Sequence, residues 1–439
     1  MFQMFNIDIL KYSTLPSLAY AIYRSNFMKK EFNIPLIDGS TYTDLKKAYT
    51  GGMVDVYKPT SLGKVFSYDV NSLYPFTMKR YPMPIGTPKY FTGDIFKINS
   101  DAFGIFEVEV VAPDNLFYPV LQTKVKSDNV NQTISPLGKW TGWYLSEELK
   151  NAMKFGYKFK VISGYLFDKK YIFNEYVDFL YNLKSTSVKG TPDYVISKLL
   201  MNSLYGKFGA DPLMETHSVI DSNKSDEYNR KYIVTDEIDL KNGKELISFF
   251  KDSGQFDNHK LSQKNSSISI ALAVTAYARI HMSLAPRLKQ IAIDSGLTIF
   301  YMDTDSIALS GSLADKFVSN KKLGLLKLEH VFNEVVYLAP KVYAGRATDY
   351  DYIKVKGSKL PLSFEQIKSL LTKDEKVVIH QDKWYKHIDQ GFIKINREDY
   401  TLMLTDNKRK LIFDNNGNFI NTGSATPYIL NTDKIINKE

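Results

Sequence analysis

The pattern of hydrophobic and polar residues predicts helices at the start of the chain and strands after them. Residues 1–30 carry apolar positions at helical spacing, which predicts a helix or a helix pair. In "GKVFSYDV", residues 63–70, β-branched and aromatic residues precede the turn-prone "NSLYP", so we expect a strand with Asp69 at its end. Residues 87–170 contain short β-type runs separated by glycine, proline and asparagine, which is typical of a β-rich inserted unit.

The pattern then alternates between helical and irregular segments. Residues 171–208 have helical periodicity with a glycine and proline break, which predicts an antiparallel helix pair. Residues 209–265 are polar with little periodicity and predict a flexible insertion. A long apolar helix is expected over 266–294, before a hairpin in "TIFYMDTDSIALSG", residues 298–311. The tail predicts a hairpin turn at "DNNGN", residues 414–418.

Composition narrows the possible functions. The 439 residues are 44% hydrophobic, which is enough for two to four structural units, and 57 Lys and Arg against 48 Asp and Glu give a net charge of +9. A basic balance suits a polyanionic partner, although it is weak support by itself. Cysteine is absent, so any metal must be held by oxygen or imidazole, which favours hard cations. The longest apolar run ends at Arg279, too short for a membrane span, and the first residues carry no export or import signal.

Two carboxylates, Asp303 and Asp305, stand at the tip of the predicted hairpin. Aspartate favours turns, and this preference alone can explain an isolated Asp-x-Asp. A calcium loop starting at Asp303 would need Gly at the sixth position and Glu at the twelfth, where the chain has Ala308 and Ala314. Neither a phosphate loop nor a zinc-protease helix motif occurs. The remaining possibility is that Asp69 completes a site for two divalent ions about 4 Å apart, as phosphoryl transfer requires.

A third element, "KLLMNSLYGKFG", begins at Lys198. Lys198, Asn202 and Tyr205 follow one another at i, i+4 and i+7, so a helix places them on one face. Such a stripe is equally consistent with a solvated helix face. A lysine within reach of triphosphate oxygens and a tyrosine that packs on a base would suit nucleotide binding, and Gly206 would allow close approach.

Taken together, these segments resemble the protein-primed branch of family B DNA polymerases, found in phages and in linear plasmids, including fungal mitochondrial ones. The resemblance rests on "DVNSLYP", "KLLMNSLYG" and "YMDTDS", which occur in the order of the family motifs. Shorter stretches agree with it: "YTGG" at 49–52, "TAYAR" at 275–279, "KVY" at 341–343 and "KVKG" at 354–357. The resemblance implies an α+β, right-hand polymerase fold with palm, fingers and thumb and two insertions.

Carried onto the chain, the resemblance implies a division into seven segments. These are a helical remnant (1–40), the first part of the palm (41–86), a first terminal-protein-type insertion (87–170), the fingers helix pair (171–208), a second insertion (209–265), the second part of the palm (266–345), and the thumb with the tail (346–439). Only about 40 residues precede "YTGG", and no exonuclease motif is found, so we expect a polymerase core without proofreading.

The resemblance also implies roles for individual residues. Asp69 and Asp305, with the Val70 carbonyl, would hold two Mg²⁺ or Mn²⁺ ions, and Asp303 would support the site. The dNTP would meet Val70, Ser72, Leu73, Tyr74, Lys184, Lys198, Asn202 and Tyr205. Among these, Tyr74 would exclude a 2′-hydroxyl. DNA would meet Tyr49, Gly51, Gly52, Thr275, Arg279, Thr304, Lys341, Tyr343, Lys354 and Lys356. For Thr275 and Arg279, burial on an apolar helix stays open as an alternative.

The implied activity is template-directed DNA synthesis from dNTPs by a monomer, primed by a terminal protein on a linear DNA element. The partners are a DNA template, a primer and that priming protein, with no membrane. The location would be the mitochondrion if the gene is organellar, and otherwise the cytoplasm of a phage or plasmid host. One alternative is a truncated, catalytically silent DNA-binding remnant. Another is a polymerase that makes or copies RNA, against which stand Tyr74 and the Thr304 that separates the two aspartates.

Overall fold

The computed structural model describes residues 2–12, 14–37, 39–61, 63–127, 130–210, 216–250, 267–283, 294–358, 361–387, 392–415, 425–432 and 434–436. Its α-helices are α1 (Phe2–Phe5), α2 (Leu15–Asn26), α3 (Gly39–Ala48), α4 (Leu73–Arg80), α5 (Ser146–Met153), α6 (Asn174–Thr186), α7 (Pro192–Phe208), α8 (Ser225–Lys231), α9 (Ile268–Ser283) and α11 (Phe364–Ser369). None of these described helices is long and apolar enough to cross a membrane.

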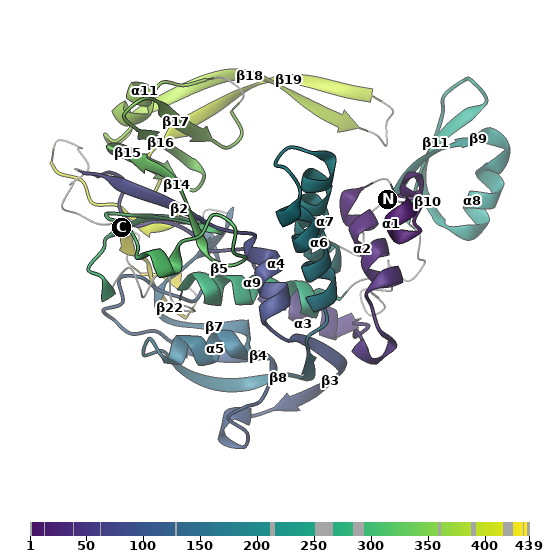
Figure 1. Ribbon diagram of the computed structural model, residues 1–439, viewed down its shortest axis with the longest axis horizontal. Coiled ribbons are helices and arrows are strands. Elements are labelled where there is room, and N and C mark those ends of the chain that lie inside the picture. Colours follow the sequence, from purple (N-terminus) through teal and green to yellow (C-terminus); the bar gives the residue numbers. More distant parts are fainter. Residues whose placement is uncertain are drawn as a thin grey trace.

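The strands fall into several sheets (Figure 1). In the first half of the chain they are β1 (Val54–Val56), β2 (Val65–Val70), β3 (Met83–Thr92), β4 (Gly104–Val111), β5 (Thr123–Ser127), β6 (Val130–Ile134), β7 (Leu137–Leu145), β8 (Lys158–Lys170), β9 (Thr216–Asp221), β10 (Ile233–Asp239) and β11 (Lys244–Phe250). In the second half they are β12 (Ile299–Asp303), β13 (Ser306–Leu309), β14 (Leu326–Phe332), β15 (Glu334–Ala339), β16 (Val342–Arg346), β17 (Asp351–Val355), β18 (Lys376–His387), β19 (Phe392–Met403), β20 (Arg409–Lys410), β21 (Thr426–Pro427), β22 (Ile429–Asn431) and β23 (Lys434–Ile435).

A five-stranded antiparallel sheet in the order β1-β12-β13-β2-β14 contains the predicted strand and the predicted hairpin. Strand β2 pairs with β13, with Asp69 opposite Ser306. The Val70 amide donates a hydrogen bond of 2.7 Å to the Asp305 carbonyl. Tyr68, Val70 and Ile307 are buried in the core on one side of this sheet. The expectation that the chain brings Asp69 to the tip of the hairpin is therefore confirmed.

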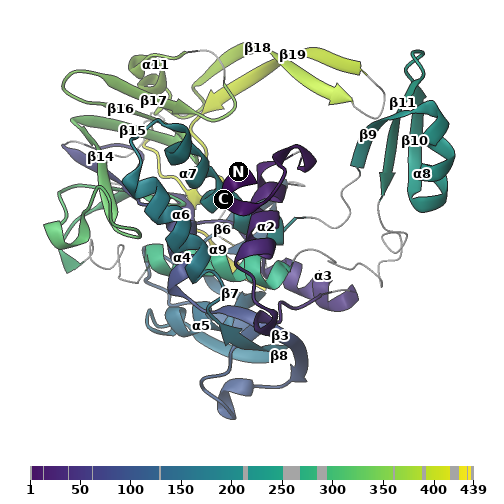
Figure 2. The same ribbon diagram turned by 45° about the vertical axis from the view of Figure 1, so that its right-hand side comes forward.

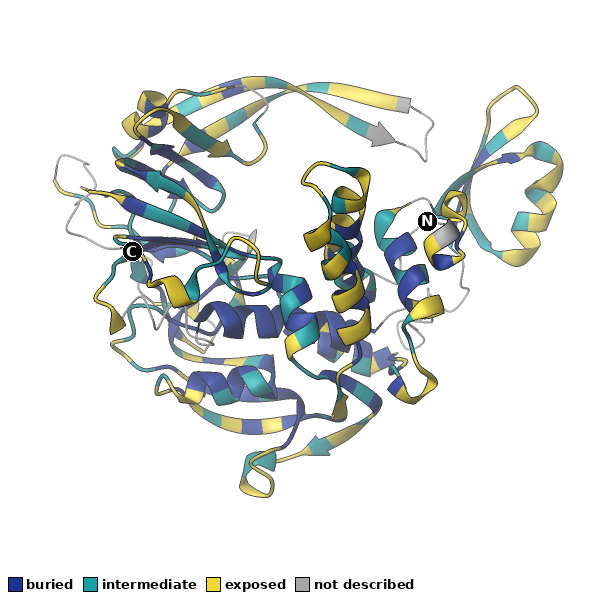
Figure 3. Ribbon diagram, viewed as in Figure 1, coloured by how far each residue is buried: buried dark blue, intermediate teal, exposed yellow. Residues whose placement is uncertain are grey.

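Helix α9 is the most deeply buried element. All 16 of its residues are buried, as its uniform dark blue colour in Figure 3 shows. Ala278 and Met282 pack into the core of the five-stranded sheet, while other residues of α9 contact α3, α4, α5 and α7. The expected helix over 266–294 is present over Ile268–Ser283, and residues 284–293 lie outside the described residues.

Residues 83–170 form most of a second, six-stranded sheet in the order β23-β22-β7-β4-β8-β3, with α5 packed on it. The β-rich character expected for residues 87–170 is present. The end of the chain returns to this sheet, where β22 pairs in parallel with β7, and no pattern in the sequence predicted this. In Figure 1 this sheet lies below α9, opposite the five-stranded sheet.

A buried arginine holds the returning tail. Arg409 is 2% exposed, and its guanidinium donates to the carbonyl oxygens of Ala425 at 2.7 Å and Phe117 at 2.8 Å. It also forms an ion pair of 3.3 Å with buried Asp55 of β1. The planar guanidinium supplies several donors in fixed directions. One side chain therefore connects the tail, the five-stranded sheet and the chain before β5.

The antiparallel helix pair predicted for residues 171–208 is present as α6 and α7. Both helices pack against α2 through a group of aromatic rings. Tyr23 of α2 has its ring centroid 5.1 Å from that of Phe173, 5.8 Å from that of Tyr176 and 6.1 Å from that of Phe208. The Tyr23 hydroxyl donates to the carbonyl of Ile172 at 3.1 Å. The opening helices therefore support the base of the α6–α7 pair.

The expectation of a flexible insertion over residues 209–265 is wrong for residues 216–250. Strands β9, β10 and β11 form a sheet with α8 beside it. Its small core contains Ile220, Ile247 and Phe249, on which Tyr228 and Tyr232 pack. The unit is too small for a long periodic pattern, and its polar surface masked this core in the sequence. Residues 251–266 lie outside the described residues.

The last part of the chain builds a three-stranded sheet, β15-β16-β17, and a long hairpin of β18 and β19. Each hairpin strand has 12 residues, and neither was predicted from the sequence. In both ribbon views the hairpin arches above α7 toward the β9–β11 sheet (Figures 1 and 2). The predicted turn at 414–418 lies largely outside the described residues.

Candidate active site

The hairpin turn places Asp305 beside the end of β2. Thr304 has a positive φ of 56°, which turns the chain sharply between β12 and β13. The Thr304 amide donates to the Met53 carbonyl at 2.7 Å, and the Asp305 amide donates to the Asp303 carbonyl at 2.6 Å. Because Asp69 pairs with Ser306, the next residue, its carboxylate lies next to Asp305. The two predicted acids are therefore brought together.

These two carboxylates lie in an environment that disfavours their charge. Burial, and after it the negative charge of Asp305, raise the pKa of Asp69 to about 7. Burial is also the main cause that raises the pKa of Asp305. Two partly desolvated acids repel each other, and a cation between them would remove this penalty.

Asp303 has a different environment. It is 5% exposed, and the Lys341 ammonium lies 2.6 Å from its Oδ1. The hydroxyl of Thr304 donates to the same carboxylate at 3.3 Å, and that of Tyr301 at 3.4 Å. The Lys341 amide in turn donates to the Tyr301 hydroxyl at 2.8 Å. Asp303 thus has a protein cation as its partner, which suits a supporting residue. Lys341, which was predicted to contact DNA, forms this ion pair.

The donor atoms suit a hard cation. Among the described residues, no group of three or more His, Cys, Asp or Glu side chains is arranged to hold a metal. Magnesium, however, is usually bound through one or two carboxylates and completes its shell with water and substrate phosphates. The pair of Asp69 and Asp305, with unfavourable charge and oxygen ligands only, fits that pattern.

Two lysines face the carboxylates from the helix pair. Lys184 of α6 donates to the Ser72 hydroxyl at 3.1 Å, and Ser72 has a positive φ of 54° before α4. Burial lowers the pKa of Lys184, and the charge of Lys198 lowers it further. Lys198 is exposed on α7, and its charge also lowers the pKa of Asp69. Positive charge therefore lies near the carboxylates, and in the described part of the chain neither lysine forms an ion pair with them.

Tyr74 and Tyr205 form the wall of the site beside these lysines. Their ring centroids are 4.2 Å apart, with 32° between the ring planes. Burial is the main cause that raises the pKa of Tyr74, followed by the neighbouring Tyr205. Asn202 is exposed on the same helix as Tyr205. The side chain of Leu73, also expected to contact the nucleotide, is 2% exposed and packs in the sheet core, so only its backbone is left for such a contact.

The loop "YTGG" rests on the hairpin tip. A Cβ at Gly52 would lie 2.7 Å from Thr304 Cγ2 and 3.0 Å from its Cα, so only glycine fits at position 52. The Tyr49 hydroxyl packs closely against Gly209, since a Cβ added to Gly209 would lie only 2.7 Å from the hydroxyl oxygen. Lys124 donates to the Tyr49 carbonyl at 3.0 Å. The loop is therefore packed between the hairpin and the end of α7.

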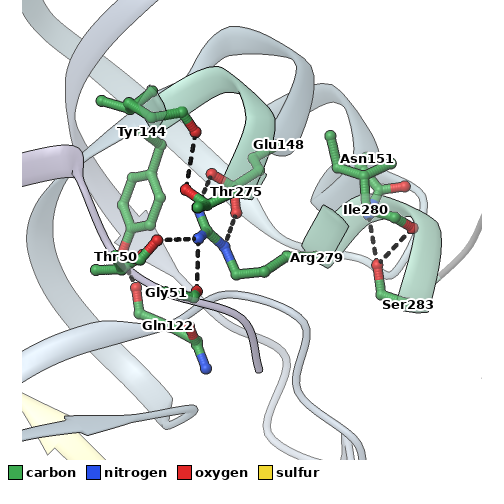
Figure 4. Close-up of polar contacts among 11 residues, drawn as sticks. Thr50, Gly51, Gln122, Tyr144, Glu148, Asn151, Thr275, Arg279, Ile280 and Ser283 are labelled. Carbon is green, nitrogen blue, oxygen red and sulfur yellow. Dashed lines mark hydrogen bonds and ion pairs between the residues drawn. The ribbon is translucent and has the colours of Figure 1, made fainter. Parts of the chain in front are cut away.

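Arg279 holds this loop from inside the protein. Its Nη1 donates at 2.8 Å to the carbonyl oxygens of both Thr50 and Gly51. Its Nε and Nη2 donate at 2.8 Å to the two carboxylate oxygens of Glu148 (Figure 4). The arginine is 3% exposed and Glu148 also 3%. We call this group, formed by Arg279, Glu148 and the two carbonyls, the loop clamp.

The loop clamp corrects two predictions. Direct DNA contact by Thr275 and Arg279 is wrong, because both side chains are buried and the Thr275 hydroxyl donates to the Leu272 carbonyl at 3.0 Å. The alternative of burial on an apolar helix is the one observed. Glu148 was missed, although an acid at a buried position inside the predicted insertion was a signal that it pairs with a cation elsewhere.

The remaining predicted DNA contacts gather on the sheet next to the hairpin. Tyr343 of β16 pairs with Lys354 of β17, whose Nζ lies 5.6 Å from the Tyr343 ring centroid. The centroid of the Tyr343 ring is 5.4 Å from that of Tyr301, which lies in strand β12 of the hairpin. The Lys356 amide donates to the Lys341 carbonyl at 3.0 Å. These residues lie together, on the side of the hairpin away from β2.

Comparisons with known proteins agree with this arrangement. The family model of DNA polymerase type B, organellar and viral, matches residues 1–290. The chain belongs to this family. A protein named probable DNA polymerase from Ascobolus immersus is 38% identical over 98% of this chain, which covers 35% of the relative. The DNA polymerase of Bacillus phage Nf is 27% identical over 72% of this chain and 52% of its own length.

The solved structure of Phi29 DNA polymerase with primer-template DNA and incoming nucleotide substrates has a TM-score of 0.65 and 21% identity, covering 90% of this chain and 68% of that one. The chain therefore has the right-hand polymerase fold, with mixed α and β structure. It spans about a third to a half of the length of the curated relatives described above.

Because burial and the charge of Asp305 disfavour the ionised form of Asp69, we predict that the stability of this type B polymerase chain depends on pH. The pKa of aspartate is near 3.9 in an unfolded chain and that of folded Asp69 is about 7, so the contribution of Asp69 to stability falls as pH rises from about 4 to about 7. In EDTA, Asp69→Asn should raise the melting temperature at pH 8 by about 1 °C, for a gain of about 1 kcal/mol after allowing for solvent at this side chain.

The measurement is thermal unfolding followed by fluorescence between pH 4 and 8. The difference between Asp69→Asn and wild type should grow up to about pH 7 and then level off, whereas the exposed-acid control Asp315→Asn should show no such trend. A constant difference across this range would contradict the assignment of a raised pKa to Asp69.

The loop clamp predicts a large stability effect from a small substitution. Glu148→Gln leaves the Arg279 charge buried without a carboxylate, which costs about 3–5 kcal/mol. The matched control is Glu147→Gln, one residue earlier on α5, whose ion pair with Lys150 is partly exposed and contributes about 0–1 kcal/mol. Urea unfolding checks both variants, and equal losses would show that the buried pair is not important for stability.

Proposed function

We propose that this chain carries the polymerase centre of a DNA-directed DNA polymerase, which extends a 3′ end from dNTPs on a DNA template. The observation that supports this most is the convergence of Asp69 and Asp305 with Lys184, Lys198 and the Tyr74–Tyr205 pair at one place. The groups come from β2, the hairpin turn, α4, α6 and α7, and the set supplies acids, cations and an aromatic wall. Nucleotidyl transfer needs all three.

Asp69, Asp305 and the Val70 carbonyl would hold two Mg²⁺ or Mn²⁺ ions. When bound, such ions make the 3′-hydroxyl a better nucleophile and balance charge on the triphosphate. The raised pKa of Asp69 supports a cation site, because an unpaired acid at this place is otherwise partly protonated near neutral pH. Asp303 stays with Lys341 and keeps the hairpin turn in position.

Lys198 and Lys184 would orient the triphosphate of the dNTP. Lys198 is exposed at the face of α7 toward Asp69, where an anionic substrate reaches it from solvent. Lys184 is held by Ser72, so its ammonium is already placed before the substrate arrives. Electrostatic attraction to two cations fixes the substrate beside the carboxylates. Asn202 and Tyr205 would border the nascent base pair.

Tyr74 would select deoxyribonucleotides. Its ring is fixed by Tyr205 and largely buried, so it cannot move aside at low cost. A 2′-hydroxyl on the incoming sugar would meet this ring. The loop at Tyr49, Gly51 and Gly52 would carry the template strand above the hairpin, held there by the loop clamp.

We also propose roles for the larger segments of the chain. We assign the palm to 41–86 and 266–345, the fingers to 171–208 and the thumb to 346–439. The sheet over 87–170 would contact a priming protein. The unit over 209–265 would encircle the DNA and support processivity. The chain would act as a monomer that copies a linear DNA element. Relatives in fungi and in Bacillus phages support such a genetic setting, with the mitochondrion as the compartment in a fungus.

The test of the polymerase centre is dNTP incorporation on a primed DNA template with Mg²⁺. Asp305→Asn should lower the rate by at least about 1000-fold, because an acid that holds the metal is lost. Asp315→Asn, an exposed acid outside the site, should keep the wild-type rate. Primer-template binding by gel shift should persist in Asp305→Asn. If folded wild-type protein binds DNA but incorporates nothing, the chain is a silent DNA-binding remnant instead.

Sugar selection provides a separate test. Tyr74→Val removes the ring against the sugar, so the ratio of kcat/KM for dNTP over ribonucleotide should fall by about 10–100-fold, equivalent to about 1–3 kcal/mol. Tyr81→Val, which removes a ring stacked on Tyr277 away from the carboxylates, is the matched control. An unchanged ratio in Tyr74→Val would remove Tyr74 from this role.

A further inference from the structure

The amide side chain of Asn71 joins the end of β2 to the 319–325 loop, which leads into β14. Its Nδ2 donates to the carbonyl oxygens of Ser319 at 2.6 Å and Lys322 at 3.2 Å. Asn71 directly precedes Ser72 of the candidate active site. One amide group therefore connects this loop to the chain segment that carries the site.

The 319–325 loop is held by contacts of its own. The Ser319 hydroxyl accepts hydrogen bonds from the amides of Lys321 at 3.3 Å and Lys322 at 3.0 Å. Gly324 has a positive φ of 80°, and a Cβ there would lie 2.1 Å from Cδ2 of Phe76 in α4. The loop therefore packs directly on α4 and can support a contact from another element.

Helix α6 contacts this loop through Tyr181. The Tyr181 hydroxyl donates to the Lys321 carbonyl. Lys184 follows Tyr181 by three residues, so both side chains lie on one face of the helix. The Lys184 ammonium is 5.4 Å from the centroid of the Tyr181 ring, within the range of a cation–π contact. Tyr181 therefore touches both the loop and the lysine.

These contacts form a closed circuit that begins and ends at two adjacent residues. From Asn71 it passes through the 319–325 loop and Tyr181 to Lys184, and Lys184 donates to the Ser72 hydroxyl at 3.1 Å. We call Asn71, the 319–325 loop and Tyr181 the lysine support.

A lysine that binds phosphate gains from such a support. A long side chain loses rotamer freedom when a ligand fixes it, and a lysine that is already fixed avoids this loss on binding. Burial lowers the pKa of Lys184, so water solvates its ammonium only in part. The ammonium has three N–H donors, of which Ser72 accepts one, and phosphate oxygens can accept from the others.

We propose that Asn71 and Tyr181 are positioning residues for the incoming nucleotide, which act through Lys184 and do not touch the substrate themselves. The proposal rests on the proposed role of Lys184 in triphosphate binding. Without the lysine support, Lys184 loses its fixed place beside Ser72 and dNTP binding weakens. The carboxylates stay in place, because the pairing of β2 with β13 is not changed. The loss therefore affects KM more than kcat.

The test uses Asn71→Ala and Tyr181→Phe, which break the lysine support at opposite ends. Asn71→Ala keeps the main-chain bonds of position 71, whose amide donates to the Leu325 carbonyl at 2.9 Å and whose carbonyl accepts from the Gly324 amide at 3.0 Å. Tyr181→Phe removes one hydroxyl and keeps the aromatic ring beside Lys184.

The measurement is titration with dATP of the full chain bound to a primer-template in Mg²⁺. The next template base is thymine, and the primer ends in a dideoxynucleotide, so binding occurs without incorporation. Each variant should raise the Kd for dATP about 5–10-fold, the effect of losing about one hydrogen bond. On a normal primer, KM should rise by a similar factor while kcat stays within about twofold.

Two matched controls lie outside the lysine support. Asn26→Ala also removes an amide that donates to two carbonyls, and Tyr428→Phe also removes a hydroxyl that donates to a carbonyl. Both should bind dATP as wild type does.

A double-variant cycle with Lys184→Met separates positioning from a general structural role. If Asn71 acts through Lys184, adding Asn71→Ala to Lys184→Met should not weaken dATP binding further. Additive losses would overturn the proposal, as would an unchanged Kd in both single variants or a loss confined to kcat.

Binding and incorporation can fail separately. If the wild-type chain binds dATP on the dideoxy primer but extends no normal primer, the proposed polymerase activity fails, and the Kd values still decide the positioning role. If the wild-type chain binds no dATP, the positioning role is overturned.

Discussion

The antiparallel pairing of β2 with the β12–β13 hairpin is the constraint on which the site depends. It sets Asp69 opposite Ser306 and so brings Asp69 and Asp305 together in a partly desolvated position. Among the described residues, no lysine, arginine or histidine forms an ion pair with either acid, whereas Asp303 is paired with Lys341. The hairpin therefore separates three nearby acids into one that the protein neutralises and two whose charge a ligand must balance.

The rest of the molecule supports this pairing from both sides. Buried α9 packs against the sheet through Ala278 and Met282, and its Arg279 reaches the loop that covers the hairpin tip. Gly52 lets that loop approach Thr304 closely. Through Glu148, the six-stranded sheet is joined to the same loop. One buried ion pair thus links α5, which packs on that sheet, to the loop over the hairpin tip.

Much of the site could be predicted from the sequence, because local patterns encode it. Alternating β-branched and aromatic residues gave β2, turn residues gave the hairpin, and helical spacing placed Lys198 and Tyr205 on one helix. Less of the fold could be predicted where stability comes from small or distant contacts. The β9–β11 unit has a core of only a few apolar side chains, and β22 joins β7 almost 300 residues away in sequence.

The sequence by itself determined which chemical groups are present, in which order, and on which kind of element. The tertiary structure alone decided what each group faces. It buried the side chains of Leu73 and Thr275, and it paired Arg279 with Glu148. The physical reason is that propensity and periodicity act over a few residues, whereas burial and charge pairing depend on neighbours that only packing brings together.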